Sequence, residues 1–446
     1  MKKTPMMFIL CAALTFGSAG PGMADDARLM SMIQNMQTQM EGMQKLIAAQ
    51  GAEIQALKKQ SPERSVLPEP AGNFKENLKA SIGDSDRWLK DLDFKGDVRL
   101  RYEALDFSDG ETVKGTRDRN RFRYRLRFGW DKQLYDDLSL GFWLASGDTA
   151  AGTSTNDTLD TDFSKKLIWI ERIYVNYTPS YIKGLRITAG KFENPLVSTA
   201  LVWDSDIRPE GLYEHYKFSL MGGKVSPFVT LGQWILQEDS VGAPGDAELF
   251  VYQTGLDWIA SDDFLNDQPL KVKLAASYYD FTDYGDSFVA AGGNPLQANG
   301  NLAAQDFNLG DVYFETRFTP IKIGDKPVPL KLFAHYIQNF DGSAIQTTTS
   351  LDDQDYAYGY GLQVGEIKAP GDWTFYWRYG FIAPNAVPGG LADADFGAAN
   401  RRGMQGSFTY RLRDNLDFEF TTYLTGNVTG VDTENRTFQS NLLMKF

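Results

Sequence analysis

The hydrophobic period changes near Leu92, and this change limits the folds open to the chain more than any other feature. From Leu92 to Phe446, apolar and polar residues alternate along short segments separated by turn-forming residues. Such alternation is typical of β-strands with one apolar and one polar face. The sequence predicts sixteen strands, near residues 92–105, 119–132, 137–148, 166–178, 184–192, 210–220, 224–237, 247–259, 268–281, 309–319, 328–339, 355–368, 372–382, 403–412, 415–425 and 434–446.

The connections between these segments alternate in length. Short links lie at residues 134–136, 179–183, 221–223, 260–266, 320–327, 369–371 and 413–414. The intervening connections are mostly longer and lie at residues 106–118, 149–165, 193–209, 238–246, 282–308, 340–354, 383–402 and 426–433. An even strand number with short turns on one side and long loops on the other is typical of outer-membrane barrels. We therefore expect an all-β fold, a 16-stranded antiparallel transmembrane β-barrel. The alternative is a soluble sandwich, whose strands also alternate.

Arginines and aromatic residues share the second predicted strand. Phe122, Tyr124 and Phe128 lie on one face, and arginines occupy every second position of the other. Arginines on the lipid-facing surface would cost several kcal/mol in total, so the lumen is their expected location. The expected basic wall of the lumen consists of Arg99, Arg101, Arg119, Arg121, Arg123, Arg125 and Arg127. The sequence leaves open whether these side chains face a solute or pair with lumenal carboxylates and only brace the wall.

Two other segments are irregular or specialised. In the strand near 166–178, Glu171 falls among apolar residues, which predicts a bulge or a register error. The last residue, Phe446, ends an alternating strand. A terminal aromatic residue of this kind resembles the signal that barrel assembly machinery recognises in its clients.

The first residues read as a targeting segment. Residues 1–24 combine Lys2 and Lys3 with an apolar stretch and small residues before Asp25, the pattern of a secretory signal peptide. The only cysteine, Cys11, lies in this segment, so the mature chain is expected to have none.

Residues 25–60 are expected to form an α-helical coiled coil that oligomerises the protein. The a and d positions follow a spacing of four and three residues over about four heptads. The seam consists of Leu29, Ile33, Met36, Met40, Met43, Ile47, Gln50, Ile54 and Leu57. A single amphipathic helix packed on its own domain is the alternative. Residues 61–91 form a proline-containing linker in which Asn73 fits the N-cap of a short helix, and residues 92–446 form the barrel.

Composition excludes several classes of function. One cysteine and two histidines allow no disulfide framework, thiolate zinc site, iron–sulfur cluster or covalent haem. The net charge of −13 argues against a nucleic-acid partner. No catalytic constellation stands out around His215 or His335, and acidic loop runs are better explained as solvated loops than as metal sites. We expect no cofactor, no metal and no enzymatic activity.

The chain resembles the putative porin family of Gram-negative bacteria. The resemblance rests on the helical segment before the barrel, on Phe446, and on two stretches, Leu185–Phe192 with sequence LRITAGKF and Trp203–Leu212 with sequence WDSDIRPEGL. It implies a trimer of outer-membrane barrels, embedded in lipid, that passes small hydrophilic solutes. The short turns place both termini of the barrel on the periplasmic side, so the coiled coil is expected in the periplasm. In sixteen-stranded porins the third long-side loop enters the lumen, so residues 193–209 are expected to narrow the pore. The acids of this expected constriction are Glu193, Asp204, Asp206 and Glu210.

The expected function is passive diffusion through a water-filled lumen, with the dense arginines favouring anions. The alternative is a barrel scaffold that sheathes a periplasmic redox partner or tethers the outer membrane to the cell wall.

Overall fold

The computed structural model describes residues 92–109, 119–147, 152–238, 246–284, 292–295, 307–341, 354–430 and 433–446. The expected signal peptide, coiled coil and linker lie outside these residues. Among the described residues, no helix has the length and apolar character needed to cross a membrane.

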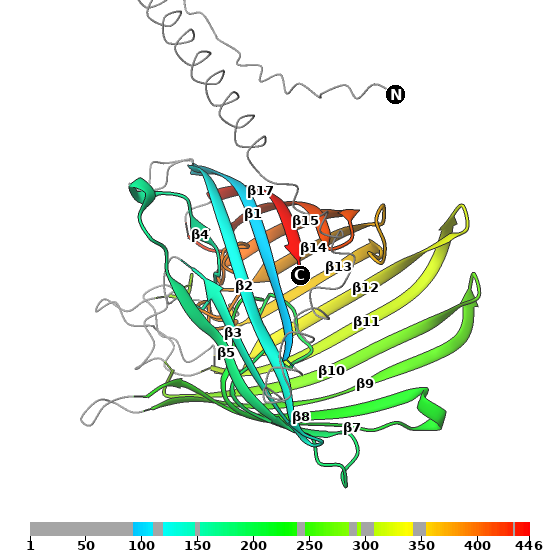
Figure 1. Ribbon diagram of the computed structural model, residues 1–446. Helices are drawn as coiled ribbons and strands as arrows, with labels where there is room; N and C mark the ends of the chain where they lie inside the picture. Colours follow the sequence, from blue (N-terminus) through cyan, green and yellow to red (C-terminus); the bar gives the residue numbers. More distant parts are fainter. Residues whose placement is uncertain are drawn as a thin grey trace, which may run out of the picture. The chain divides into compact units, whose positions relative to one another are not determined.

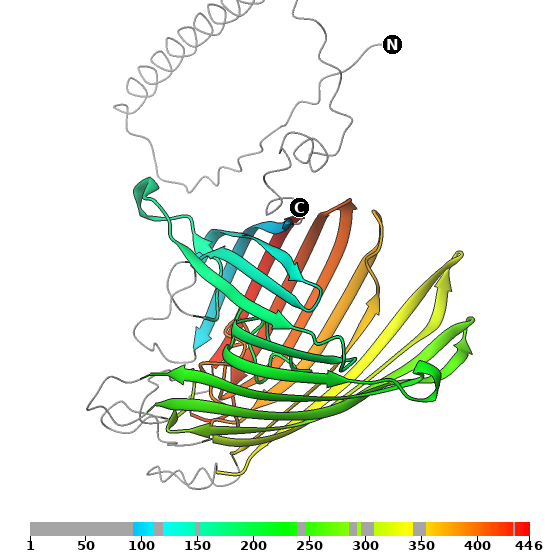
Figure 2. The same cartoon turned by 60° about the horizontal axis from the view of Figure 1, so that its bottom comes forward.

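Sixteen long strands form a closed antiparallel barrel in the described part of the chain (Figures 1 and 2). They are β1 (Leu92–Asp109), β2 (Arg119–Tyr135), β3 (Leu138–Ser146), β5 (Ile168–Tyr177), β6 (Leu185–Lys191), β7 (Glu210–Lys217), β8 (Val225–Gln237), β9 (Ala247–Leu265), β10 (Gln268–Thr282), β11 (Phe307–Ile323), β12 (Lys326–Asn339), β13 (Tyr356–Gly365), β14 (Trp373–Ile382), β15 (Arg401–Arg413), β16 (Leu416–Asn427) and β17 (Thr433–Lys445). The two-residue strand β4 (Asp157–Thr158) pairs with β2, and two 3-10 turns lie at Thr161–Phe163 and Met221–Gly223. The predicted strand number and antiparallel order are confirmed.

The barrel closes between its first and last strands. In Figure 1, β17 in red lies beside β1 in blue, and the two pair in register from Asp97 with Lys445 to Asp109 with Thr433. Phe446 extends this ladder. Its backbone N–H donates to the Gly96 carbonyl at 3.0 Å, and the Gly96 N–H donates to the Phe446 carbonyl at 2.9 Å. The Phe446 ring is 61% exposed, so it can contact lipid or a folding factor.

Removing Phe446 should impair outer-membrane assembly more than it weakens the finished barrel. The truncation removes two backbone hydrogen bonds at the barrel seam, each contributing about 0.5–1.5 kcal/mol, and leaves the rest of the β1–β17 ladder intact. We expect lower levels of the protein in the outer membrane and nearly unchanged heat resistance of the molecules that assemble. Normal outer-membrane levels of a chain ending at Lys445 would contradict this expectation.

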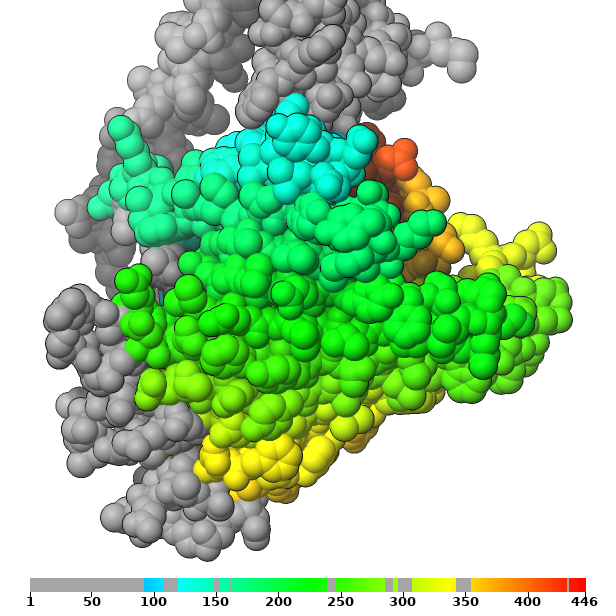
Figure 3. All heavy atoms as spheres, turned by 90° about the horizontal axis from the view of Figure 1, so that it is seen from below, coloured from blue at the N-terminus to red at the C-terminus, as the bar shows by residue number. Residues whose placement is uncertain are grey.

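The outer surface of the barrel is apolar. Large side chains at alternate strand positions point outward and are exposed, among them Leu100, Phe122, Phe128, Tyr252, Leu332, Phe375, Phe418 and Leu442. Figure 3 shows this surface over the green to yellow part of the chain, where side chains of neighbouring strands form one continuous layer. Exposed apolar surface on so many strands fits lipid rather than water.

Turn chemistry explains where the strands extend beyond their predicted bounds. The link predicted at 260–266 is mostly strand, because β9 continues to Leu265. The true turn is Asn266–Asp267, with φ of 56° at both residues. Asparagine and aspartate tolerate this left-handed conformation, which two-residue hairpin turns require. Polar residues such as Asp262 therefore belong to a strand end and not to the turn.

The irregularity predicted at Glu171 is a bulge. On β5, Arg172 pairs with Trp143 and Ile170 pairs with Leu144, so Glu171 has no partner in the β3–β5 ladder. The extra residue lets Glu171 turn inward, where it is buried. This bulge places a carboxylate inside the barrel beside the loops described below.

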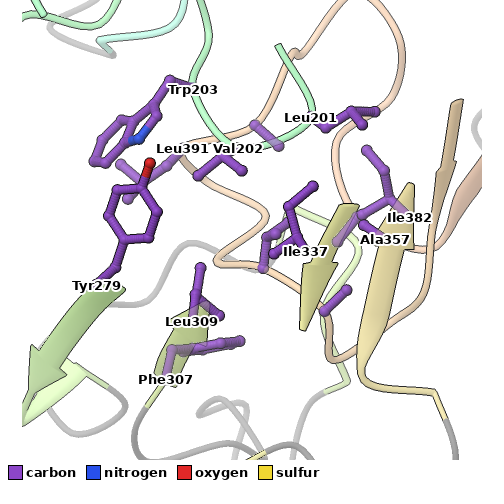
Figure 4. Packing of buried hydrophobic residues seen from close by; sticks show 14 of the residues in the cluster. Leu201, Val202, Trp203, Tyr279, Phe307, Leu309, Ile337, Ala357, Ile382 and Leu391 are labelled. Atoms are coloured by element: carbon purple, nitrogen blue, oxygen red, sulfur yellow. The ribbon is translucent and has the colours of Figure 1, made fainter. Parts of the chain in front are cut away.

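A packed apolar cluster fills part of the lumen. Its wall residues include Trp234, Leu249, Tyr279, Phe307, Leu309, Ile337, Ala357 and Ile382. Leu201, Val202 and Trp203 from loop 192–209 and Leu391 from loop 383–400 pack onto them (Figure 4). The Trp203 ring lies 5.4 Å from that of Trp234 and 6.2 Å from that of Tyr279. Two long-side loops therefore enter the lumen on the β8–β14 side.

Candidate functional site

A polar cavity of about 590 Å³ lies beneath the two inward loops. Residues of β1 and β2 line one part of it, including Arg99, Arg101, Arg121 and Arg123. Residues of β11 to β17 line the remainder, among them Lys331, Arg378, Ser407 and Thr421. The loops contribute Asp204, Asp206, Asp393 and Asp395. The apolar cluster and the cavity thus divide the lumen into a packed part and an open polar part.

Arginines face one another across β1 and β2. Arg99 pairs in register with Arg125, and Arg101 pairs with Arg123. Like charges directly opposite on a sheet destabilise it unless counter-charges intervene. Glu103 supplies one counter-charge, because its side chain is 1% exposed, lies 3.5 Å from Arg101 Nη1, and also forms an ion pair with Arg121.

A second carboxylate neutralises the next arginines toward the short-turn end. Asp97 Oδ1 lies 2.7 Å from Arg125 Nη2, and Asp97 Oδ2 accepts from Arg127 Nε at 2.8 Å. Arg125 and Arg127 lie outside the cavity lining. Much of the basic wall is therefore braced by lumenal carboxylates, which is the alternative that the sequence leaves open.

Arg99 and Arg119 of the expected wall differ in position and hydrogen bonding from the arginines that pair with Glu103 or Asp97. Arg99 lines the cavity and donates to Asn156 Oδ1 at 2.6 Å rather than to a carboxylate. Arg119, at the long-loop end of β2, is exposed and lies outside the lining. Of these two arginines, only Arg99 therefore reaches the cavity.

Of the four expected constriction acids, two lie at the cavity. Asp204 accepts from the Asp206 N–H at 2.9 Å and from the Ala394 N–H at 3.1 Å. Asp206 accepts from Thr155 Oγ1 at 3.2 Å and lies 3.9 Å from Arg127 Nη1. By contrast, Glu193 pairs with Arg172 and Glu210 pairs with Lys191, and both glutamates are outside the lining.

The two loop aspartates have different pKa values. Burial raises the pKa of Asp204 to about 7, and the nearby charge of Asp393 adds to this effect. Burial alone would also raise the pKa of Asp206, but Arg99, Arg125 and Arg127 outweigh it and hold that pKa below its usual value. Asp206 is therefore charged at neutral pH, while Asp204 changes charge close to neutrality.

Partly buried hydrogen bonds fix loop 192–209 to the wall. Thr199 Oγ1 lies 2.8 Å from His335 Nδ1, and His335 Nε2 lies 3.2 Å from Asp311 Oδ2. The Val197 N–H donates to Gln253 Oε1 at 2.9 Å. The other histidine, His215, contacts Thr230 on the next strand. The contacts of Thr199 and Val197 position the loop. Among the described residues, no group of three or more potential ligands could hold a metal ion.

The sequence predicts the long connection at 383–402, but not that it enters the lumen or that its acids Asp393 and Asp395 line the cavity. Asp393 pairs with Arg378 on β14, and Asp395 Oδ2 lies 3.4 Å from Arg101 Nη1. A signal existed in the composition, since Ala-Val-Pro-Gly-Gly-Leu-Ala is an apolar, poorly solvated sequence for a loop. Apolar residues in a loop are usually buried against other apolar residues of the protein.

The sequence matches the model of a family described as putative porin, over residues 111–288 and 303–446. The chain belongs to this family of outer-membrane porins. A comparison with curated proteins gives no match for this porin.

Solved porins resemble the structure at low identity. OmpF of Salmonella typhi is 12% identical, with 80% of this chain and 97% of that chain covered and a TM-score of 0.44. The outer membrane channel DcaP of Acinetobacter baumannii is 15% identical, with 80% and 97% covered and a TM-score of 0.44. OmpT of Vibrio cholerae is 12% identical, with 80% and 99% covered and a TM-score of 0.40.

The porin's ion preference should depend on pH near neutrality through Asp204. Because its pKa is about 7, Asp204 is charged above that value and neutral below it. Lowering the pH from about 8 to about 6 therefore removes a negative charge from a lining that also holds Asp206 and Asp393. We expect the reversal potential in a KCl gradient to move toward anion preference.

The matched control for this pH effect is Asp204→Asn. This variant should show the low-pH preference throughout the range, so most of the pH-dependent shift should disappear. A shift of equal size in the Asp204→Asn variant would assign the pH dependence to other groups.

Proposed function

We propose that this porin passes small hydrophilic solutes and ions by passive diffusion, with a preference for anions. The observation that carries the proposal is the polar cavity of about 590 Å³ that the inward loops leave open beside the arginines of β1 and β2. A lumen formed by sixteen strands is wide enough to hold water. The polar lining provides donors and acceptors that replace part of a solute's hydration shell.

Charge at the cavity supports anions over cations. Among the described lining residues, six are basic and five are acidic. The five acids carry less than their full negative charge, because Asp204 is only partly ionised at neutral pH. Arg99 has an amide rather than a carboxylate as its hydrogen-bonding partner. Fixed charges in a narrow passage with low-dielectric walls act strongly on permeating ions.

Liposome swelling tests passive diffusion. Liposomes that contain the purified porin should swell in isotonic solutions of small neutral sugars and small organic anions, and more slowly as solute size increases. Liposomes without protein are the control. Absence of swelling with every small solute would contradict a diffusion pore and favour a scaffold role, in which a partner protein fills the barrel.

We also infer that the porin is a homo-oligomer, most simply a trimer, joined by the seam Leu29–Leu57 in the periplasm. The supporting evidence is the regular heptad spacing of that segment. A chain that lacks residues 25–87 should still insert through the barrel assembly machinery. Its oligomers should dissociate at a lower temperature in detergent. Equal dissociation temperatures for the truncated and full-length proteins would mean that the barrel walls alone hold the oligomer.

A further inference from the structure

Loop 383–400 joins β14 to β15 and lies inside the barrel. Ala383, Ala386, Val387 and Ala392 are fully buried, and Phe396 is 1% exposed. Its apolar residues join the cluster that also holds Leu201 and Val202 of loop 192–209. The loop is therefore fixed by packing at the level of the constriction.

Backbone hydrogen bonds join this loop to loop 192–209. The Asp204 N–H donates to the Leu391 carbonyl at 2.7 Å, and the Asp393 N–H donates to the Ala200 carbonyl at 3.0 Å. The Ala394 N–H donates to Asp204 Oδ2 at 3.1 Å. Segments about 190 residues apart in sequence thus form one structural unit above the cavity.

Two aspartates of loop 383–400 reach basic side chains on two different strands of the wall, β14 and β1. Asp393 pairs with Arg378 on β14, and its Oδ1 also accepts from the Asp395 N–H at 3.0 Å, which fixes the local turn. Asp395 Oδ2 lies 3.4 Å from Nη1 of Arg101 on β1, and the Asp395 side chain is 38% exposed. Both aspartates line the cavity.

Asp393 and Asp395 differ in how much of each side chain is exposed, and this difference gives them different roles. Asp393 has a side chain that is 13% exposed and contacts a guanidinium that is 4% exposed, so its pair holds the loop in place. Asp395 is more exposed to the cavity and contacts Arg101, which already has Glu103 as a second carboxylate neighbour. A mobile ion in the cavity therefore meets the charge of Asp395 more directly than that of Asp393.

We propose that loop 383–400 is a second constriction loop and that Asp395 is a selectivity-determining residue for small anions. Asp395 offsets Arg101 and limits the anion preference of the passage, while Asp393 is a positioning residue that acts through Arg378. This assignment rests on the proposed diffusion function. It differs from the expectation that Glu193, Asp204 and Asp206 of residues 193–209, with Glu210 just beyond, supply the acid side.

The first experiment measures the reversal potential of the full-length porin in a planar bilayer under a KCl gradient. The variant is Asp395→Asn, which keeps the side-chain shape and removes the charge. Glu193→Gln and Glu210→Gln are matched controls, because each also removes one loop-associated carboxylate that pairs with a basic residue outside the cavity. We expect a stronger anion preference for Asp395→Asn and little change for the controls.

A covalent charge substitution separates the effect of charge from loop displacement. The chain has no cysteine after Cys11, so Asp395→Cys introduces a single reactive thiol into the mature protein. Modification with a negatively charged sulfonatoethyl methanethiosulfonate should restore the wild-type reversal potential. The positively charged aminoethyl reagent should increase anion preference further.

The outcomes are distinguishable. Reversal potentials of Asp395→Asn that match those of the two glutamate controls, or equal effects of both thiol reagents, would overturn the role of Asp395 while leaving diffusion intact. A wild-type porin that carries no current and passes no solute would overturn both the diffusion function and this assignment.

Discussion

Replacing Arg121, Arg123 and Arg125 together with serine is expected to turn the porin from the proposed anion preference to cation preference and to raise its conductance. Arg121 and Arg123 line the cavity, and Arg125 neutralises Asp97 beside them. The triple variant removes three positive charges and leaves Glu103 and Asp97 with fewer partners. It also opens space, because serine is much smaller than arginine. A reversal potential that changes sign in a KCl gradient would report this result.

The control is the matched triple change to lysine. Lysine keeps the charge but lacks the planar fork with which arginine binds carboxylates. The lysine variant should therefore retain anion preference even if the barrel is less stable to heat. An unchanged reversal potential in the serine variant would mean that these side chains only brace the wall and do not influence permeating ions.

Releasing loop 192–209 from the wall should have the second large effect, and Leu201→Asp is the change that does so. Leu201 is 2% exposed and packs over two glycines, since a Cβ atom at Gly359 would lie 2.8 Å from Leu201 Cδ1 and one at Gly380 would lie 3.0 Å from Cδ2. An unpaired charge in a buried site costs about 3–5 kcal/mol. Each 1.4 kcal/mol changes the equilibrium between the packed and the displaced loop about tenfold. The displaced loop should therefore become highly populated.

We expect larger and noisier single-channel currents from Leu201→Asp and nearly wild-type currents from Leu201→Met, which keeps an apolar side chain of similar volume. Both variants should form barrels with the same heat resistance, because the strand ladders are untouched. A Leu201→Asp porin with wild-type conductance would show that loop 192–209 does not narrow the passage.

The barrel could be predicted from sequence because its alternation has a period of two. That period fixes which side of each strand faces the lumen, so the inward direction of Arg99, Arg101 and Arg121 follows once the strands are identified. Turn positions cannot be read from the sequence in the same way, because polar strand ends such as Asp262 resemble turns. Only the left-handed conformation of Asn266 and Asp267 distinguishes the real one.

The constriction could be predicted only in part, because its contacts are long-range. The third long-side loop was expected in the lumen from family resemblance, and Asp204 and Asp206 lie at the cavity. No local pattern links Thr199 to His335 or Asp204 to Ala394, which are 136 and 190 residues apart. Glu193 and Glu210 pair with Arg172 and Lys191 outside the cavity lining, and no local pattern marks these tertiary partners.

The most direct test of an anion-preferring constriction is the reversal potential of single channels formed by the purified full-length porin. The measurement uses a planar bilayer with a KCl gradient near neutral pH, with detergent lacking protein as the blank. We expect discrete channels whose reversal potential has the sign of anion preference. Channels with cation preference, or no channels at all from correctly folded protein, would contradict the assignment.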